Sequence, residues 1–166
     1  AQTTLGISTF IKTLIDDADA GTAQTTLGIS TFIKTLIDDA SATVALATLG
    51  ISSGTWTATL TNIVNVDASS WSGGNYEIFG TRCHCWGRLT IDPTAAANTT
   101  TQVGVSLPVA SNLSSSVHLS GLLTSNLNQR SGTIAADTTN DRATLSFNSE
   151  VTTNGTYYFD FWYTII

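Results

Sequence analysis

AQTTLGISTFIKTLIDDA, residues 1–18, recurs without change at residues 23–40, and a third copy runs from Ala45 to Ser52 as ALATLGIS. The repeat therefore has a period of 22 residues. Apolar residues fall at helical spacing on one face of each unit, in the first unit at Ile7, Phe10, Ile11, Leu14 and Ile15. The stretch predicts repeated amphipathic helices, and a single unit of this kind cannot bury its apolar face alone.

Signals for helix ends divide each repeat. Ser8 is placed to cap a first helix, and Asp19 to cap a second helical stretch that runs to Leu27. Gly28 followed by apolar Ile29 is typical of a left-handed helix end. We therefore expect each unit to contain a helix, a kink, a second helix and a stop.

The apolar face of the repeat can be buried only against another chain or another part of the same chain. Burial of one large aliphatic or aromatic side chain is worth roughly 1.5–3 kcal/mol, and an isolated rod would expose several of them. We expect an oligomer interface made by Phe10, Ile11, Leu14, Ile15, Phe32, Ile33, Leu36 and Ile37. A monomeric helical solenoid is the alternative, although two units and a fraction are few for a self-sufficient array.

The composition changes after the repeats. Residues 1–52 contain only two of the aromatic residues, and from Gly54 onward apolar residues alternate with period two between Gly, Asn, Pro and Ser clusters. We predict a helical repeat stalk over 1–52 (1–22, 23–44 and a partial 45–52) and an all-β head over 53–166, of sandwich or jelly-roll type. The expected strands are 55–61, 75–79, 82–91, 101–107, 118–124, 142–148 and 156–165.

Two of these strands have chemically distinct faces. In 156–165 the residues Tyr157, Phe159, Phe161, Tyr163 and Ile165 should face the core, with Tyr158, Asp160, Trp162 and Thr164 opposite. In 82–91 the core face should hold Cys83, Cys85, Leu89 and Ile91, and the other face Arg82, His84, Trp86 and Arg88. That second face suits a sugar ring or carboxylates, and it also suits a polar subunit interface. We favour the interface and assign Trp86 and Trp162 to it.

Several classes of function find no support in the sequence. Charged residues are 11% of the chain, the net charge is −6, and the six basic residues are scattered, which argues against nucleic acid as a partner. No run of 18 apolar residues exists, so we expect no membrane insertion. In Cys83-His84-Cys85, alternation separates the thiols from the imidazole, which predicts two buried free thiols and no metal site.

Catalysis and cofactors are likewise not indicated. His84 and His118 lie within strand patterns without a nucleophile elbow, so a catalytic triad is not expected. A pair of carboxylates for glycoside hydrolysis would have to come from Asp67, Glu77, Asp137, Asp141 and Asp160, and nothing in their spacing selects two of them. We predict that the chain is not an enzyme and needs no cofactor.

Five stretches together resemble the tail-fibre proteins of bacteriophages, over essentially the whole chain. They are the repeat AQTTLGIS…FIKTLIDDADA, GTWTATLTN at 54–62, SLPVASN at 106–112, DTTNDRATLSF at 137–147 and the closing aromatic strand. The resemblance implies a homotrimeric, extracellular fibre of the virion, joined to an upstream fibre segment of the same protein. Its distal β-sandwich head would contact polysaccharide or lipopolysaccharide of the host surface. Such proteins carry Val-like residues where Cys83 and Cys85 stand, in agreement with a core position.

The expected function is thus that of a trimeric receptor-binding tip. Its candidate ligand contacts are aromatic and polar side chains expected in exposed loops: Trp71, Tyr76, Asn126, Asn128, Gln129 and Arg130. For Trp71 an edge-plugging role in the sandwich is an equal alternative. The alternative function is a structural fibre part, decoration or trimerisation cap without receptor binding, and a glycan-cleaving enzyme is the third.

Overall fold

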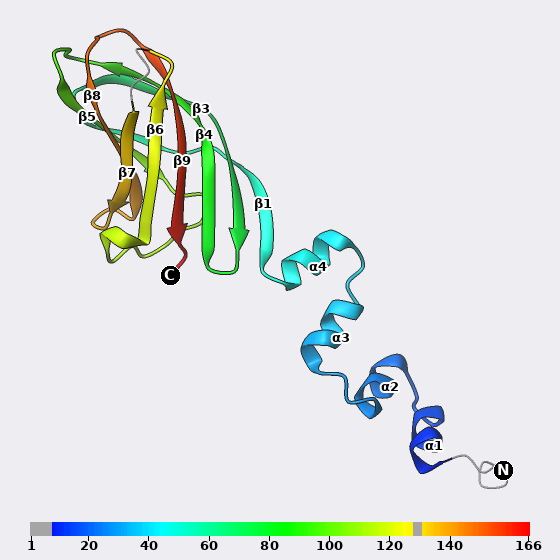
Figure 1. Ribbon diagram of the computed structural model, residues 1–166. Helices are drawn as coiled ribbons and strands as arrows, with labels where there is room; N and C mark the ends of the chain where they lie inside the picture. The colour runs from blue at the N-terminus through cyan, green and yellow to red at the C-terminus, as the bar shows by residue number, and fades with distance from the viewer. Residues whose placement is uncertain (1–7, 128–130) are drawn as a thin grey trace. The chain divides into compact units, whose positions relative to one another are not determined.

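The computed structural model describes residues 8–127 and 131–166, and it divides the chain into two compact units between Leu49 and Gly50. Strands make up 49% and helices 20% of it. The first unit holds four helices and the second nine strands (Figure 1). Ile51 and Ser52, assigned from the sequence to the third helical repeat, lie in the first strand of the second unit.

The helices of the first unit are short and individually capped. They are α1 (Thr9–Ile15), α2 (Ala20–Thr26), α3 (Thr31–Ile37) and α4 (Ala42–Thr48). Ser8 and Asp19 accept hydrogen bonds from the backbone N–H groups of Ile11 and Thr22, which confirms both predicted caps. Gly28, at φ +73°, follows α2, and the N–H groups of Gly28 and Ile29 donate to the carbonyls of Thr25 and Gln24. This is the predicted left-handed stop.

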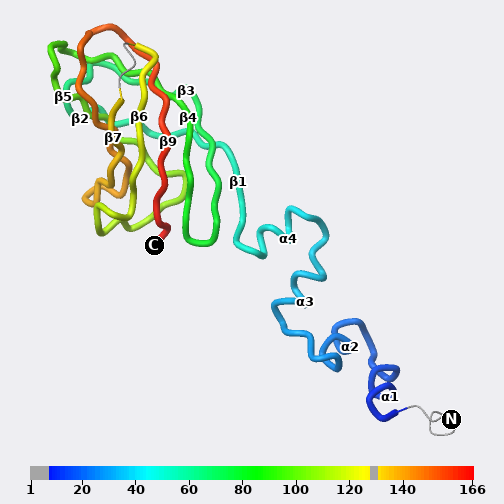
Figure 2. The backbone as a smooth tube through the Cα atoms, viewed as in Figure 1, coloured from blue at the N-terminus to red at the C-terminus, as the bar shows by residue number. Residues whose placement is uncertain are grey.

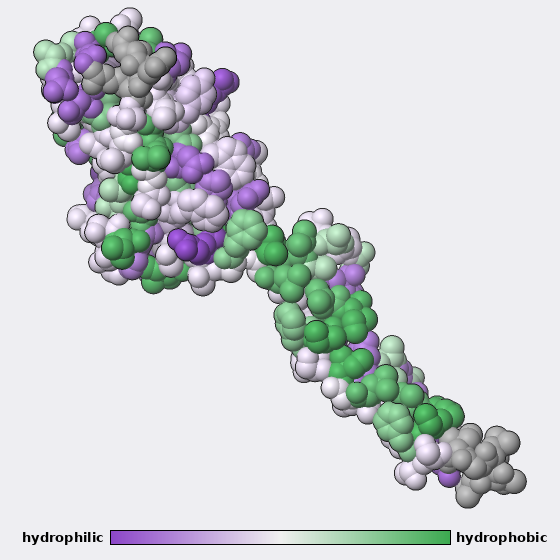
Figure 3. Space-filling view, in the orientation of Figure 1, coloured by the Kyte–Doolittle hydropathy of each residue, from purple (hydrophilic) through white to green (hydrophobic). Residues whose placement is uncertain are grey.

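The predicted stalk of 22-residue helical repeats is nevertheless wrong as a fold class. Each helix has seven residues, about two turns, and no long helical repeat is evident in the described part of the chain. The physical reason lies in the repeat itself, because every unit encodes two caps and a stop as well as two helical segments. None of the four helices has a buried residue, and apolar surface gathers over them in Figure 3.

The second unit is one antiparallel sheet of nine strands. In chain order the strands are β1 (Ile51–Trp56), β2 (Leu60–Val64), β3 (Val66–Phe79), β4 (Arg82–Pro93), β5 (Thr99–Ser106), β6 (Leu119–Ser125), β7 (Ser131–Asp137), β8 (Arg142–Ser149) and β9 (Gly155–Thr164). A 3-10 turn, η1 (Ser116–His118), precedes β6. In space the order is β1-β3-β4-β9-β6-β7-β8-β5-β2, with every pair antiparallel (Figures 1 and 2).

The predicted sandwich or jelly roll is therefore also wrong, because the nine strands form one continuous curled sheet. Consecutive β1 and β2 lie at its two opposite edges, and the curl brings these edges together. The Trp56 indole N–H donates to the Ser106 carbonyl at 3.1 Å, and the Ser69 hydroxyl donates to the Asn62 side chain at 2.6 Å. Alternation in the sequence cannot separate the two folds, since both give each strand one inner and one outer face.

The inner face of the curled sheet holds the core. Its buried residues include the inward set of the last strand, Tyr157, Phe159, Phe161 and Tyr163, as predicted. Cys83 and Cys85 are both buried and free, with their sulfur atoms 3.7 Å apart, which confirms the predicted pair of core thiols. The Tyr163 hydroxyl donates to the Val109 carbonyl at 2.9 Å and so ties the segment before β6 to this core.

Three parts of the sheet differ from the expectation. The predicted strand 55–61 is not one strand, because β1 ends at Trp56 and β2 begins at Leu60. Strand β7 was missed, and β3 starts nine residues before the predicted 75–79. Both are rich in Ser, Gly and Ala, which have low strand propensity. They are strands because each is hydrogen-bonded along both sides, β3 to β1 and β4, and β7 to β6 and β8. Among the described helices, none has the length and apolar character of a membrane span.

Candidate ligand-binding groove

The outer face of β1, β3, β4 and β9 carries side chains in register across the four strands. Three rows follow from the pairing of the strands: Ser53, Glu77, His84 and Trp162; Thr55, Asn75, Trp86 and Asp160; and Gly73, Arg88 and Tyr158. The residues between them on β4 and β9, such as Cys85 and Phe161, are buried inside. The predicted outer face of strand 82–91 is thus confirmed, and it is part of a wider surface.

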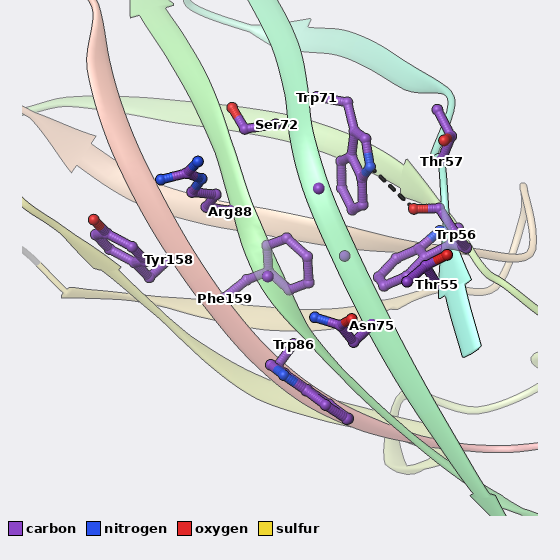
Figure 4. A pocket seen from close by; sticks show the side chains of 13 residues that line it. Thr55, Trp56, Thr57, Trp71, Ser72, Asn75, Trp86, Arg88, Tyr158 and Phe159 are labelled. Atoms are coloured by element: carbon purple, nitrogen blue, oxygen red, sulfur yellow. Dashed lines mark hydrogen bonds between the residues drawn. The ribbon is translucent and has the colours of Figure 1, made fainter. Parts of the chain in front are cut away.

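Two hollows open on this surface beside Trp86. The larger, about 820 Å³, includes Asn75, Arg88 and Tyr158 in its lining (Figure 4). The smaller, about 300 Å³, includes Ser53 and Glu77. Thr55, Asn75 and Trp86 line both. We call the two hollows together the Trp86 groove.

Glycine residues make room for the groove. Gly73 has φ +141° and follows a register shift in β3, so no side chain fills the third row at this point. A Cβ atom on Gly74 would lie 2.4 Å from the Trp56 ring, and one on Gly87 would lie 2.3 Å from the Gly73 carbonyl oxygen. The strands can therefore approach closely here only because both residues lack a side chain.

Aromatic rings form the layer under the larger hollow. Trp71 stacks on Phe159 with ring centroids 5.3 Å apart and lies 4.8 Å from Trp56. Its indole N–H donates to the Trp56 carbonyl at 3.1 Å, drawn as the dashed line in Figure 4. These contacts fix the rings, so the hollow has a rigid apolar base.

A second stack holds Trp86, which is partly buried. The His84 ring lies 4.9 Å from Trp86 on one side and is nearly parallel to Trp162 on the other, at 4.2 Å and 7°. The His84 Nε2 atom is 3.0 Å from a carboxylate oxygen of Asp160, and the Arg82 guanidinium lies 6.0 Å from the Trp162 ring centre. Trp86 is thus held in one orientation before any ligand arrives, which lowers the entropic cost of binding.

The thiols behind this surface take no part in it. The hydrogen bond with Cys83 and burial raise the pKa of Cys85 far above its ordinary value, so Cys85 stays a neutral thiol. Burial likewise raises the pKa of the neighbouring Tyr163. Neither group is exposed, and both belong to the core. Within the described residues no group of three or more His, Cys, Asp or Glu side chains is arranged to hold a metal ion.

The structure does not bring the predicted ligand contacts together at one site. Trp71 and Tyr76 lie within β3 and not in a loop, and each lines one hollow of the Trp86 groove while packing on the core. The Asn126 side chain accepts the Thr156 N–H at 3.1 Å and fastens β6 to β9. Asn128, Gln129 and Arg130 lie outside the described residues.

The predicted interface residues are placed as follows. In α1 and α3 the side chains of Phe10, Ile11, Ile15, Phe32, Ile33 and Ile37 are 41–56% exposed, and Leu14 and Leu36 are partly covered. Trp86 and Trp162 lie on the outer face of the sheet, Trp162 at 38% exposure. Their role between chains stays a prediction.

The five carboxylates considered for hydrolysis do not converge. Asp137 pairs with Arg142 at 2.8 Å, Asp141 accepts the Leu113 N–H at 2.7 Å, and Asp160 is bound to His84. Asp137 and Asp141 flank the turn between β7 and β8, each with its own structural partner, whereas Asp160 lies on β9. Only Glu77 and Asp160 share the outer face described above.

No protein-family model, no curated protein and no solved structure matches the chain. Three residues that line the larger hollow, Trp56, Asn75 and Tyr158, were not predicted as ligand contacts. The sequence signal for the hollow was the glycine-rich segment SGGN at 72–75, which pairs with Gly87 on the next strand.

Proposed function

We propose that this chain is the receptor-binding part of a bacteriophage tail fibre, and that the Trp86 groove binds glycan on the host surface. The observation that carries the proposal is Trp86 itself, an indole fixed by stacking and shared by two adjoining hollows. The assignment to a tail fibre, on the virion and outside the cell, is supported by the resemblance of the repeat and of the head motifs.

The chemistry of the groove suits sugars. An indole offers a flat apolar surface to the C–H face of a sugar ring, and Thr55, Asn75 and Ser72 offer hydrogen bonds to hydroxyl groups. The larger hollow, about 820 Å³, lies within the usual range of about 300–1,000 Å³ for small-ligand sites. It is an open hollow on a sheet face, so it suits a short stretch of a long polysaccharide.

The helical unit supplies the second part of the proposal, a homotrimer. Its helices bury nothing by themselves, although Phe10 and Phe32 are each about half exposed. Further copies of the same chain are the partner that a repeated apolar face fits most simply. Three copies would also present three Trp86 grooves to one host surface, and multivalent contact raises overall affinity without any new interaction.

The test is a glycan array with the intact chain and two variants. Trp86→Ala should weaken binding at least about tenfold, because it removes the stacking platform of both hollows. Leu122→Ala is the matched control, since Leu122 is 65% exposed on the outer face of β6, outside the groove. Glycan binding that survives Trp86→Ala unchanged would refute the assignment of the groove.

A structural role without receptor binding is the second candidate. The outer face of β6 and β9 exposes Leu122, Tyr158 and Trp162, and a neighbouring chain could cover them. Competition for adsorption separates the two functions. If the purified protein neither binds susceptible cells nor slows attachment of the virus, the structural role is correct.

A further inference from the structure

Arg88 is the one charged residue in the lining of the larger hollow. Among the described residues its side chain has no ion pair or hydrogen bond, although the chain carries twelve acidic residues against six basic ones. Arg142, by contrast, is paired with Asp137 at 2.8 Å. The unpaired guanidinium of Arg88 thus belongs to the lining of the larger hollow, on the side where Tyr158 lies (Figure 4).

The smaller hollow is lined by a negative charge instead of a positive one. Glu77 is the one charged residue in its lining, and the structure gives it no ion pair within residues 8–127 and 131–166. Glu77 pairs with His84 in the sheet, four positions along β4 from Arg88, which is about 13 Å at ~3.3 Å per residue. The two charges thus stand at opposite ends of the groove, with Trp86 between them.

We propose that the Trp86 groove binds an anionic oligosaccharide in a fixed direction. The anionic sugar lies in the larger hollow with its carboxylate or phosphate on Arg88, and the next sugar lies in the smaller hollow with a hydroxyl or amino group on Glu77. This rests on the proposed glycan binding and adds the class and direction of the ligand.

The chemistry of the two end residues supports this direction. The planar fork of an arginine matches the two oxygens of a carboxylate or phosphate, and charge-assisted hydrogen bonds are about twice as strong as neutral ones. An ionised glutamate only accepts hydrogen bonds, so it selects a donor and repels a second anion. The net charge of −6 also disfavours a dense polyanion, so the charges of the ligand should be sparse along its chain.

The experiment measures binding of the intact protein to matched pairs of bacterial oligosaccharides. One pair contains a uronic acid and the same oligosaccharide with its carboxyl group reduced to an alcohol; a second contains a phosphorylated sugar and its dephosphorylated form. The acidic member of at least one pair should bind about tenfold more tightly than its neutral partner. The pair that shows the preference identifies the anion as carboxylate or phosphate.

Two variants assign the preference to a residue. Arg88→Gln should bind both members of the pair equally, at the level of the neutral one, whereas Lys12→Gln removes the same charge from the helical unit and should keep the preference. Equal binding of both members by the unaltered protein, or a preference that survives Arg88→Gln, overturns the inference.

The outcome also separates this inference from the proposed function. Binding that disappears in Trp86→Ala but never depends on ligand charge leaves glycan binding intact and refutes only the role of Arg88. If the unaltered protein binds no member of any pair and no glycan on the array, both proposals fail together.

Discussion

The two units of this chain differ in how far they bury their apolar side chains. In the sheet unit, residues 50–166, inward side chains from nine strands bury one another, and Phe161, Leu89 and Leu145 are fully covered. In the helical unit no helix buries a residue, and its apolar side chains remain about half exposed. The sheet unit thus has a core within one chain, whereas the helical unit has only local order.

The difference shows what a sequence repeat can and cannot encode. Each 22-residue repeat specifies two caps, two helices of about two turns each and a stop, all through contacts between residues close in sequence. Isolated helices of this length are marginal in water, so their stability has to come from packing. In the sheet unit the packing comes from strands distant in sequence, and in the helical unit we expect it from other chains.

The largest effect should follow a change in the core of the sheet unit. Phe161→Ala is expected to lower the free energy of unfolding by about 3–5 kcal/mol, because it leaves a cavity among fully buried side chains. All four Trp residues lie in the sheet unit, so their fluorescence during denaturation reports on this unit alone. The control Leu122→Ala on the exposed face should change the same quantity little. Equal losses in both variants would contradict the core described here.

A matched pair of glycine substitutions tests the local order of the helical unit. Gly28 has φ +73°, so Gly28→Ala should destabilise the end of α2 by about 1–2 kcal/mol. Gly21 lies in the first turn of α2, where alanine is favoured by roughly 0.5–1 kcal/mol, and the Asp19 carboxylate oxygen, 3.3 Å from the new Cβ, has only to shift by a few tenths of an ångström. Amide hydrogen exchange over residues 20–29 should therefore speed up in the first variant and slow down in the second. The same sign in both would show that the helix end is not where the structure has it.

A small, pH-dependent effect is expected at the turn between β7 and β8. Burial raises the pKa of Asp137, but hydrogen bonds from Asn140 and Arg142 outweigh it and hold the pKa below its ordinary value. The charged form is thus favoured by folding, so its contribution is present above about pH 4 and is lost as pH falls through the lowered pKa.

Asp137→Asn should accordingly cost roughly 0.2–1 kcal/mol at pH 7, a value typical of an ion pair near the surface. The difference between the two proteins should shrink as the denaturation midpoint is measured at successively lower pH between 5 and 2. A difference that stays constant down to pH 2 would show that the carboxylate contributes nothing through its charge.

Local features of the fold were accessible from the sequence, and features that depend on strand register were not. The caps Ser8 and Asp19, the stop at Gly28 and the two faces of the last strand are set by neighbours in sequence, and each was predicted. The order of the strands and the missed strand β7 depend on pairing between distant segments, for which a single sequence holds no direct signal.

The residues of the candidate site were likewise predictable where they share a strand and not where they meet through strand register. Trp86 and Arg88 could be placed on one face of a strand by alternation, but Asn75 and Tyr158 join them only through the register of β3 and β9 with β4. Trp71 and Tyr76 flank glycines and were expected in a loop, yet the glycines mark a close approach of two strands. The loop interpretation failed because glycine serves both purposes.

We expect copies of the chain to cover the apolar faces of the helical unit. This claim is tested most directly by the mass of the intact chain in solution. Sedimentation equilibrium should give three times the 17.4 kDa of one chain, because the apolar faces of α1 and α3 are covered only when copies associate. The double substitution Phe10→Ser with Phe32→Ser should reduce the mass to that of one chain, with the tryptophan-reported unfolding of the sheet unit unchanged. A single-chain mass for the unaltered protein at all concentrations would contradict the account.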